Sequence, residues 1–316
     1  MPSNAAKSGK IRQHRSAGCF FDWPKAACTA NRQGFSMLSY RHAFHAGNHA
    51  DVLKHFLLYC VLDYYNQKDK PYWYIDTHSG AGIYDLQGSE AQKVGEFADG
   101  IGRLVQAALP DTLASFVQHL RGCLPNPNLY GGSPWLAQSL LREADKLRLF
   151  ELHPADFQHL QHNMREAKLG RRGILKQEDG FAGLIALLPP VTRRAVVLMD
   201  PPYEQKQDYA QVAHTLKDAL KRFEQGCYMV WYPCLSRPES LQLPEKLKKL
   251  CPDNYIQAEL HVRAPSPDGF GMHGSGMFLI NPPYTLPDIL CDTLPALRDI
   301  LRQDDGARFV LDYKIR

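Results

Sequence analysis

The sequence lacks paired cysteines, and this absence limits the chemistry that we expect of it. Its 316 residues include eight cysteines, and no two of them form a C-x-x-C pair. Zinc sites and disulfide frameworks draw on closely spaced cysteines, so the spacing predicts neither, and we expect no metal ion. We interpret the cysteines as reduced thiols of a cytoplasmic protein. They are Cys19, Cys28, Cys60, Cys123, Cys227, Cys234, Cys251 and Cys291.

Long apolar runs are also absent. No stretch of about 18 uninterrupted apolar residues occurs, which argues against a transmembrane helix and a membrane partner. Near the N-terminus, Asp22, Pro24 and Lys25 interrupt the segment 17–27, so that segment has no apolar core of signal-peptide length. No internal repeat is visible.

Excess charge of one sign is confined to one end of the chain. The formal net charge is +4, but residues 1–36 carry six basic residues against Asp22, a net charge of +5, which leaves −1 for residues 37–316. Net charge therefore gives no argument for a nucleic-acid partner. Residues 1–36 show no hydrophobic periodicity, and we expect a disordered basic extension before one domain at 37–316. The alternative of an Arg-rich organelle transit peptide stays open.

The most informative stretch is the apolar run at 195–199, which ends in Asp200-Pro201-Pro202-Tyr203. Five apolar residues stopped by two prolines are typical of a buried strand in a parallel sheet, because proline cannot donate a ladder hydrogen bond. We expect Asp200 at the carboxyl end of this strand, where open α/β sheets bind their ligands. Tyr203 follows on a turn with little freedom.

Acidic residues also end or follow three earlier predicted strands: Asp76, Glu151 and Asp179. Because parallel strands end at one edge of a sheet, these side chains should lie beside Asp200. A glycine turn at 80–82 follows Asp76 and would let backbone N–H groups approach a ligand closely. The set predicts a nucleoside-bearing cofactor beside a base-binding motif.

Strands and helices alternate along the chain and predict an α/β fold with a Rossmann-like, doubly wound and mostly parallel sheet. The segment at about 83–145 is mainly helical and longer than a simple crossover requires, so we expect a helical insertion there. Ser133 is a good N-cap for the helix near its end. The predicted strands are 72–76, 147–151, 174–177, 195–199, 227–233, 255–262 and 277–281.

Four histidines crowd the segment before and within a helix predicted at 50–66, for which Asn48 is the expected N-cap. They are His42, His45, His49 and His55. Their spacing fits no standard metal motif, so a metal site is the less favoured interpretation.

Two later segments leave alternatives open. The glycine-rich loop at 263–276 is either a disordered connection or a loop that closes over substrate. Asn281-Pro282-Pro283-Tyr284 repeats the pattern of the earlier tetrapeptide, but it follows the last predicted strand, so we expect a structural role for it.

The tetrapeptide at 200–203 resembles the signature of class I S-adenosylmethionine-dependent methyltransferases that act on an exocyclic amine. The other motifs narrow the resemblance to one family. From Met37 to nearly the end, the chain resembles the bacterial ribosomal RNA large subunit methyltransferase J family. The resemblance rests on the run Met37–His55, Asp-Thr-His-Ser-Gly-Ala-Gly at 76–82, Gly-Ser-Pro at 132–134, Glu-Leu-His-Pro at 151–154, Asp-Gly-Phe at 179–181, Asp-Pro-Pro-Tyr-Glu at 200–204 and Trp-Tyr-Pro at 231–233.

The resemblance implies a 23S rRNA (adenine(2030)-N(6))-methyltransferase with S-adenosylmethionine as cofactor. It implies that Asp200 is catalytic and that Tyr40 contacts the RNA. The family has alanine after the histidine that matches His78, where this chain has Ser79. The implied cofactor contacts are His55, His78, Ser133, Glu151, Asp179, Gly180 and Asp200.

The chemistry of the reaction suggests roles for the tetrapeptide. Adenine N6 is a poor nucleophile, because its lone pair is delocalised into the ring. The Asp200 carboxylate and the Pro201 carbonyl can accept N6 hydrogen bonds, and Tyr203 can stack on a flipped base for about 1–3 kcal/mol.

Other functions remain alternatives at this point. Similar tetrapeptides serve DNA adenine-N6 and RNA guanine-N2 methyltransferases, and a non-catalytic RNA-binding module is the alternative from another class. We expect a monomer that acts in the cytoplasm on protein-free or early-assembly 23S ribosomal RNA.

Overall fold

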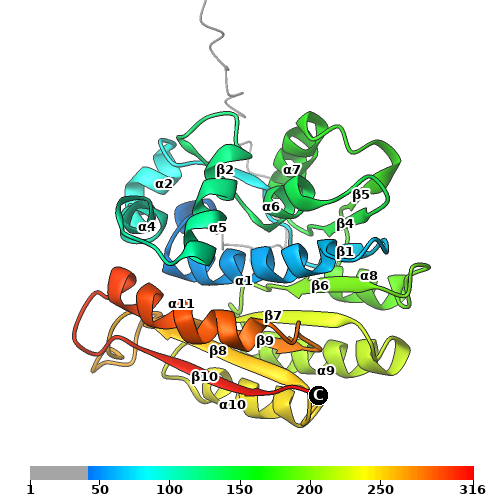
Figure 1. Cartoon of the computed structure of the whole chain (residues 1–316). Coiled ribbons are helices and arrows are strands. Elements are labelled where there is room, and N and C mark those ends of the chain that lie inside the picture. The colour runs from blue at the N-terminus through cyan, green and yellow to red at the C-terminus, as the bar shows by residue number, and fades with distance from the viewer. Residues whose placement is uncertain (1–41) are drawn as a thin grey trace, which may run out of the picture. The chain divides into compact units, whose positions relative to one another are not determined.

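The computed structural model describes residues 42–316, and eight strands form its central sheet (Figure 1). The sheet order is β10-β8-β9-β7-β6-β1-β4-β5. In chain order the strands are β1 (Trp73–Asp76), β4 (Lys146–Phe150), β5 (Gly173–Lys176), β6 (Ala195–Met199), β7 (Cys227–Cys234), β8 (Tyr255–His261), β9 (Gly274–Ile280) and β10 (Arg308–Lys314).

The five strands β5, β4, β1, β6 and β7 are parallel neighbours. The chain winds outward from β1 to β5 and then returns to place β6 on the other side of β1, so the topological switch point lies between β1 and β6. The strand β9 runs antiparallel between β7 and β8, and β10 pairs antiparallel with β8. The predicted doubly wound, mostly parallel α/β sheet is confirmed, while β10 has no counterpart among the predicted strands.

Helices cover both faces of the sheet. One face carries α1 (His49–Asn66), α6 (Ser133–Leu140), α7 (Pro154–Glu166) and α11 (Leu286–Leu301), and the other carries α8 (Gly180–Leu187), α9 (Lys206–Arg222) and α10 (Pro238–Lys248). The strand β6 serves both apolar layers, because Val196 and Leu198 pack with the first set of helices while Val197 and Met199 pack with the second. This is the fully buried strand that the apolar run predicts.

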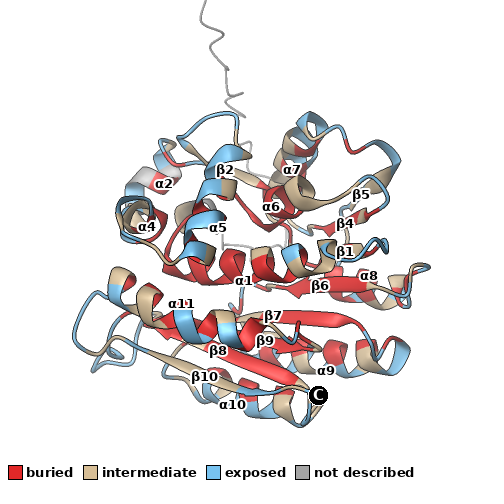
Figure 2. Ribbon diagram, viewed as in Figure 1, coloured by how far each residue is buried: buried red, intermediate tan, exposed pale blue. Residues whose placement is uncertain are grey.

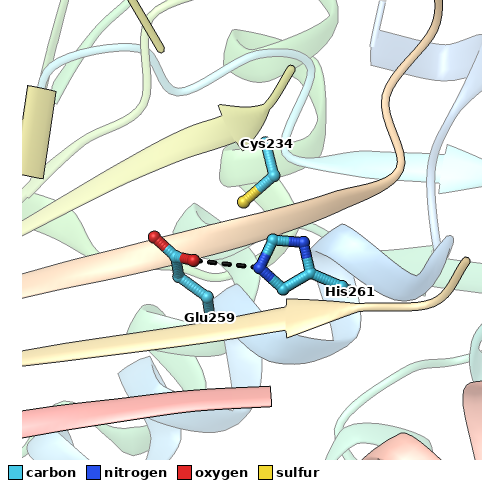
Figure 3. A group of neighbouring side chains, drawn as sticks. All are labelled: Cys234, Glu259 and His261. Carbon is cyan, nitrogen blue, oxygen red and sulfur yellow. Dashed lines mark hydrogen bonds and ion pairs between the residues drawn. The ribbon is translucent and has the colours of Figure 1, made fainter. Parts of the chain in front are cut away.

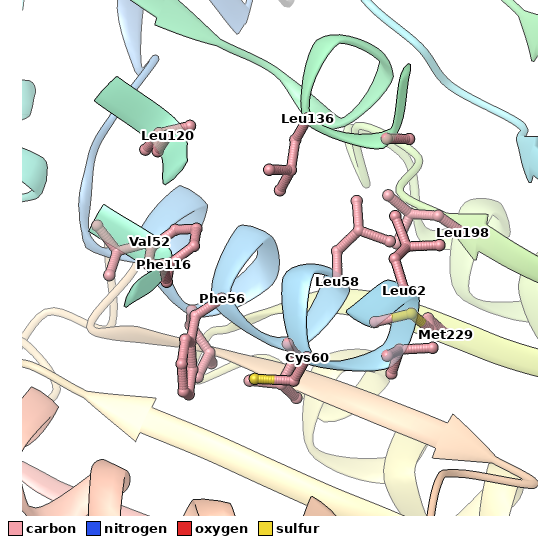
Figure 4. Packing of buried hydrophobic residues seen from close by; sticks show 14 of the residues in the cluster. Val52, Phe56, Leu58, Cys60, Leu62, Phe116, Leu120, Leu136, Leu198 and Met229 are labelled. Carbon is pink, nitrogen blue, oxygen red and sulfur yellow. The ribbon is translucent and has the colours of Figure 1, made fainter. Parts of the chain in front are cut away.

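The helix α1 lies across the sheet face and is buried on nearly all sides (Figures 1 and 2). Asn48 caps it as expected, because its side-chain oxygen accepts hydrogen bonds from the backbone of Ala50 and Asp51. Its apolar residues pack between α5 (Asp111–Gly122), α6 and the strands, where Phe56 contacts Phe116 edge-on (Figure 4). A buried helix is a costly place for charges, so its charged residues require an explanation.

The segment at 83–145, which the sequence marks as a helical insertion, begins with the short strand β2 (Ile83–Asp85). The strand pairs antiparallel with β3 (Leu129–Gly131), and between them lie α2 (Ser89–Val94), α3 (Glu96–Asp99), α4 (Ile101–Gln106) and α5. The helix α6 at the end of the segment packs against β1 and β4 and so belongs to the crossover between them.

Two further expectations concern the N-terminal extension and membrane-spanning helices. Residues 1–36, for which we expect a disordered basic extension, lie outside the described residues. Within the described part of the chain, no helix combines the length and the apolar character needed to cross a membrane.

Candidate active site

The carboxyl ends of four parallel strands bring together the acidic residues that the sequence singles out. Asp76 is the last residue of β1, and Asp200 directly follows β6. Asp76 pairs in register with Leu198, so both carboxylates lie at the switch point between the two strands. Glu151 and Asp179 follow β4 and β5 at the same edge of the sheet.

A buried lysine of α1 reaches the Asp200 carboxylate. Lys54 Nζ lies 2.6 Å from Asp200 Oδ2 and 2.9 Å from Asp51 Oδ1. Burial disfavours the ammonium, but the two carboxylates outweigh that effect and raise the pKa of Lys54 above its usual range. Lys54 is therefore a charged bridge between two carboxylates.

Asp51 anchors the other end of this bridge. Its Oδ2 accepts a hydrogen bond from the Gly47 backbone at 2.9 Å and lies 2.9 Å from His42 Nε2. Burial by itself raises the pKa of Asp51, but His42 and the Lys54 ammonium together hold that pKa well below its usual range. The charges inside α1 are thus paired, which removes most of the several kcal/mol that an unpaired buried charge costs.

One oxygen of Asp200 remains available. Oδ2 is held by Lys54, and no residue in the described part of the chain hydrogen-bonds Oδ1. The Asp200 side chain is 14% exposed, whereas that of Lys54 is 5% exposed. The lysine thus orients a carboxylate that still has an acceptor atom at the open edge of the sheet.

The turn after Asp200 is rigid. Tyr203 has a φ of +51°, and its ring packs against Tyr209 and Trp231 with centroid distances of 4.6 and 6.0 Å. The Tyr203 hydroxyl donates to the Trp231 carbonyl at 2.7 Å, and the Arg237 guanidinium donates to the backbone carbonyl of Tyr203 at 2.9 Å. The ring is only 1% exposed, so stacking on a base requires that the ring first be uncovered.

Asp76 is held in a buried cradle. Its Oδ2 accepts hydrogen bonds from Tyr74 Oη at 2.8 Å and from Ser133 Oγ at 2.6 Å. Burial raises the pKa of Asp76 to about 6, although Ser133 and Tyr74 oppose the rise.

The expectation that Ser133 is the N-cap of α6 is wrong. The cap is Gly132, and Ser133 is the first helical residue, from which its hydroxyl reaches the strand.

The glycine turn and Glu151 are joined. Gly80 has a φ of +58°, and a β-carbon there would also clash with the Tyr84 hydroxyl, so glycine is strongly favoured. Glu151 Oε2 accepts a hydrogen bond from Gly80 N–H at 2.7 Å, and Oε1 accepts one from His153 N–H at 2.7 Å. Burial raises the pKa of Glu151 to about 7, although these backbone bonds oppose the rise.

The start of α8 presses against the end of β1. Asp179 caps α8 by accepting a hydrogen bond from Phe181 N–H at 2.8 Å. A β-carbon on Gly180 would clash with the Thr77 carbonyl, so this approach requires glycine. The His78 ring contacts Phe181 edge-on at 4.8 Å, and burial lowers the pKa of His78 to about 4, which keeps it neutral.

His55 leaves one polar atom without a partner. Its Nδ1 lies 2.7 Å from Tyr130 Oη, while its Nε2 is buried and has no hydrogen-bond partner. Burial lowers the pKa of His55 to about 3, so the imidazole is neutral. Because buried polar atoms are normally satisfied, the free Nε2 suits a ligand contact. Tyr40, the expected RNA contact, lies outside the described residues.

The second Pro-Pro-Tyr motif lies elsewhere. Because β9 runs antiparallel to β7, Asn281 emerges at the opposite edge of the sheet from Asp200. Asn281 Nδ2 donates to the carbonyls of Glu224 and Gly226 at 2.7 and 2.8 Å, and Oδ1 accepts from Asn254 at 3.0 Å. Asn281 therefore holds loops together, as the expected structural role requires.

Sequence reasoning missed Asp51 and Lys54. Both lie within the helix predicted from Val52, Leu53 and the apolar residues that follow. An acid and a base three positions apart are ordinary on an exposed helix. The signal was that apolar residues surround them on every face, which predicts burial and hence a buried partner.

Three comparisons with known proteins agree with one another. A family model described as Ribosomal RNA large subunit methyltransferase D, RlmJ, matches residues 69–312. The Ribosomal RNA large subunit methyltransferase J of Haemophilus influenzae is 42% identical over 281 residues, which are 88% of this chain and 99% of that protein. The protein of the same name from Escherichia coli is 42% identical over 268 residues, 84% of this chain and 94% of that one.

A solved structure has the same fold. The crystal structure of a Legionella pneumophila protein superposes with a TM-score of 0.76 at 33% sequence identity. The superposition covers 85% of this chain and 98% of that one.

Proposed function

The chain belongs to the ribosomal RNA large subunit methyltransferase J family, and from this membership we propose that it methylates the N6 amine of an adenine in 23S ribosomal RNA. It is an enzyme with a class I, Rossmann-like methyltransferase fold, and its methyl donor is S-adenosylmethionine. The proposal for the site is that the acidic edge of the sheet holds the donor and that Asp200 holds the adenine.

Residues along the edge from β5 to β6 would hold the donor. S-adenosylmethionine, when bound, supplies an electrophilic methyl group on a sulfonium sulfur. The free Nε2 of His55 fits a ligand at this edge, while Gly80 and Gly180 allow the turn after β1 and the start of α8 to pack closely there. The proposed contacts are His55, His78, Ser133, Glu151, Asp179, Gly180 and Asp200.

Ser133 and Glu151 would act differently in such a site. The Ser133 hydroxyl already donates to Asp76, so it orients that carboxylate at the switch point. Glu151 fixes the glycine turn through Gly80 N–H, and its second oxygen faces the His153 backbone. Carboxylates at this position of dinucleotide-type folds bind ribose hydroxyls, which is the role we propose for Glu151.

Asp200 would act on the adenine amine. Its Oδ1 and the Pro201 carbonyl accept the two N6 hydrogen bonds, which draws the nitrogen lone pair out of conjugation and toward the methyl group. Lys54 fixes the carboxylate through Oδ2 and is a positioning residue. A carboxylate shared with an ammonium is suited to orienting N6 and stabilising developing positive charge, so its main effect is electrostatic.

The remaining substrate contacts rest on the tetrapeptide and on family resemblance. We propose that Tyr203 stacks on the flipped base after its ring is uncovered, and that Tyr40 contacts the RNA. We further propose that the enzyme is a cytoplasmic monomer and that its substrate is protein-free or early-assembly 23S rRNA.

The observation that carries the proposal is the Asp200 carboxylate, held by Lys54 at the switch point with one oxygen available. The test is to incubate the protein with isotopically labelled S-adenosylmethionine and protein-free 23S rRNA, and to digest the product to nucleosides. The expected label is in N6-methyladenosine. Label in N2-methylguanosine, label only with DNA, or RNA binding without turnover would each overturn the proposal in favour of a different function.

A further inference from the structure

Figure 3 shows a second polar cluster, Cys234, Glu259 and His261, at the carboxyl ends of β7 and β8. Cys234 belongs to the apolar layer on the sheet face opposite α1. Cys234 is the last residue of β7, and Glu259 and His261 lie near the end of β8. Both strands pair with β9, which brings Cys234 and His261 opposite the same residue, Gly274. The Cys234 sulfur, a Glu259 oxygen and a His261 nitrogen all lie within 4.8 Å of one another.

Glycine keeps the space between these side chains open. Gly274 and Gly276 are the residues of β9 that face the cluster, and neither places a side chain between β7 and β8. A β-carbon on Gly276 would clash with the ring of Tyr232. The three candidate ligands thus converge across an empty stretch of the middle strand.

The surroundings orient the carboxylate and the imidazole. Glu259 Oε1 accepts hydrogen bonds from Tyr232 Oη and Gln257 Nε2, both at 2.8 Å. This leaves Oε2, which lies 2.9 Å from His261 Nε2. On the other side of the ring, His261 Nδ1 lies 3.1 Å from His273 Nδ1. In metal sites the second ring nitrogen of a ligating histidine is held in this way, which fixes its tautomer and orientation.

From this geometry we propose that Cys234 Sγ, Glu259 Oε2 and His261 Nε2 form a binding site for a zinc-class divalent ion. A thiolate, an imidazole and a carboxylate are the donor types that zinc prefers. Zinc bonds of about 2.0–2.3 Å place tetrahedral ligands roughly 3–4 Å apart, so the side chains need to move only slightly. The ion replaces the His261–Glu259 hydrogen bond and takes the proton from the thiol into solution.

The site offers three protein ligands and one open position. A cavity of about 390 Å³ adjoins the cluster and is lined by Cys234, Glu259 and His261 together with Ser240 of α10 and Arg308 of β10. A water molecule or an anion from this cavity can complete the tetrahedron. The ion ties β7 to β8 across β9, on the face of the sheet away from Lys54.

The experiment measures metal directly on the full-length protein, without reference to RNA methylation. Cys19 and Cys28 are replaced by serine in every sample, because they lie outside the described residues and could bind metal themselves. The chelator-treated protein is incubated with zinc and dialysed, and zinc per chain is measured by mass spectrometry. Cobalt loading reports a thiolate ligand through its near-ultraviolet charge-transfer band.

The expected result is one zinc per chain, a cobalt–thiolate band, and an unfolding temperature that rises with zinc. Cys234→Ser removes the band, and Glu259→Gln weakens binding at least about tenfold. Cys227→Ser is the matched control, because it removes a buried thiol at the other end of β7 and leaves binding intact.

If Cys234→Ser does not fold, the cobalt spectrum of the wild type and the zinc affinity of Glu259→Gln test the proposal. The proposal is overturned by zinc that dialyses away from the wild type, by a cobalt spectrum without the thiolate band, or by binding that survives Glu259→Gln unchanged.

Discussion

Lys54 Nζ lies 2.6 Å from Asp200 Oδ2, although 146 residues separate them along the chain. The contact joins α1, the first α-helix of the described residues, to the loop after β6. It makes the orientation of the proposed catalytic carboxylate depend on a buried ammonium, which Asp51 holds from the other side at 2.9 Å.

Replacing Lys54 with methionine keeps an unbranched side chain that is one atom shorter and removes its charge. The change leaves two carboxylates close together without their shared cation, so we expect kcat to fall at least about tenfold and the free energy of unfolding to fall by about 3–5 kcal/mol. Steady-state rates and urea unfolding measure the two effects. Lys176→Met is the matched control, because Lys176 is half exposed and forms its ion pair with Glu178, away from Asp200. Full activity of Lys54→Met would show that the contact does not orient Asp200.

Glu151 predicts a specific dependence of stability on pH. Burial raises its folded pKa from the ordinary 4.5 to about 7, so between these values the folded protein keeps a proton that the unfolded chain releases. The contribution of Glu151 to stability is therefore lost as the pH rises through that window. Glutamine at position 151 does not titrate. The free energy of unfolding of Glu151→Gln relative to that of the wild type should therefore rise by up to about 3 kcal/mol from pH 4.5 to 7.

Urea unfolding of the cofactor-free proteins at several pH values checks this expectation. The same pH series on Glu178→Gln is the control for the same substitution at a half-exposed position after β5. A flat difference for Glu151→Gln would contradict the assignment of a raised pKa.

Gly180 is the point at which α8 meets β1. Alanine there places a methyl group against the Thr77 carbonyl, so we expect a loss of about 1–3 kcal/mol and weaker binding of S-adenosylmethionine. Gly122→Ala is the matched control, because nothing lies within 4 Å of its added β-carbon. Calorimetric binding and thermal unfolding distinguish the two variants, and equal behaviour would contradict the close approach.

Replacing Asn281 tests whether the second Pro-Pro-Tyr motif has a structural or a catalytic role. Asn281→Ala loses hydrogen bonds to Glu224, Gly226 and Asn254, so the free energy of unfolding should fall by about 1–3 kcal/mol while kcat of the folded protein stays unchanged. The measurement is kcat per folded molecule beside a urea titration. A selective loss of kcat would place the second Pro-Pro-Tyr motif in the active site.

Local patterns were enough to predict most of the sheet and one side of the site. The run at 195–199 is apolar at every position, and the acids at 76, 151 and 200 end or directly follow predicted strands, so both the strand and the edge of the sheet could be inferred. In contrast, β10 is an edge strand whose apolar run, 309–311, is only three residues long, and its exposed residues include the charged Arg308 and Lys314.

Contacts between distant segments could not be inferred in this way. The Lys54–Asp200 pair depends on how α1 crosses the sheet, and no local pattern contains that information. The cluster of Cys234, Glu259 and His261 could not be predicted from the sequence for a related reason. Its members come from two strands with a third between them, so the absence of a cysteine pair did not bear on it.

The most direct test of the account compares the wild type with Asp200→Asn under single-turnover conditions, with saturating S-adenosylmethionine and protein-free 23S rRNA. The measured quantity is the rate at which N6-methyladenosine forms. Asparagine keeps the shape of the side chain but replaces one acceptor oxygen and removes the charge, so we predict a rate at least about 100-fold lower in a folded protein. A rate within a few-fold of the wild type would contradict the central role of Asp200.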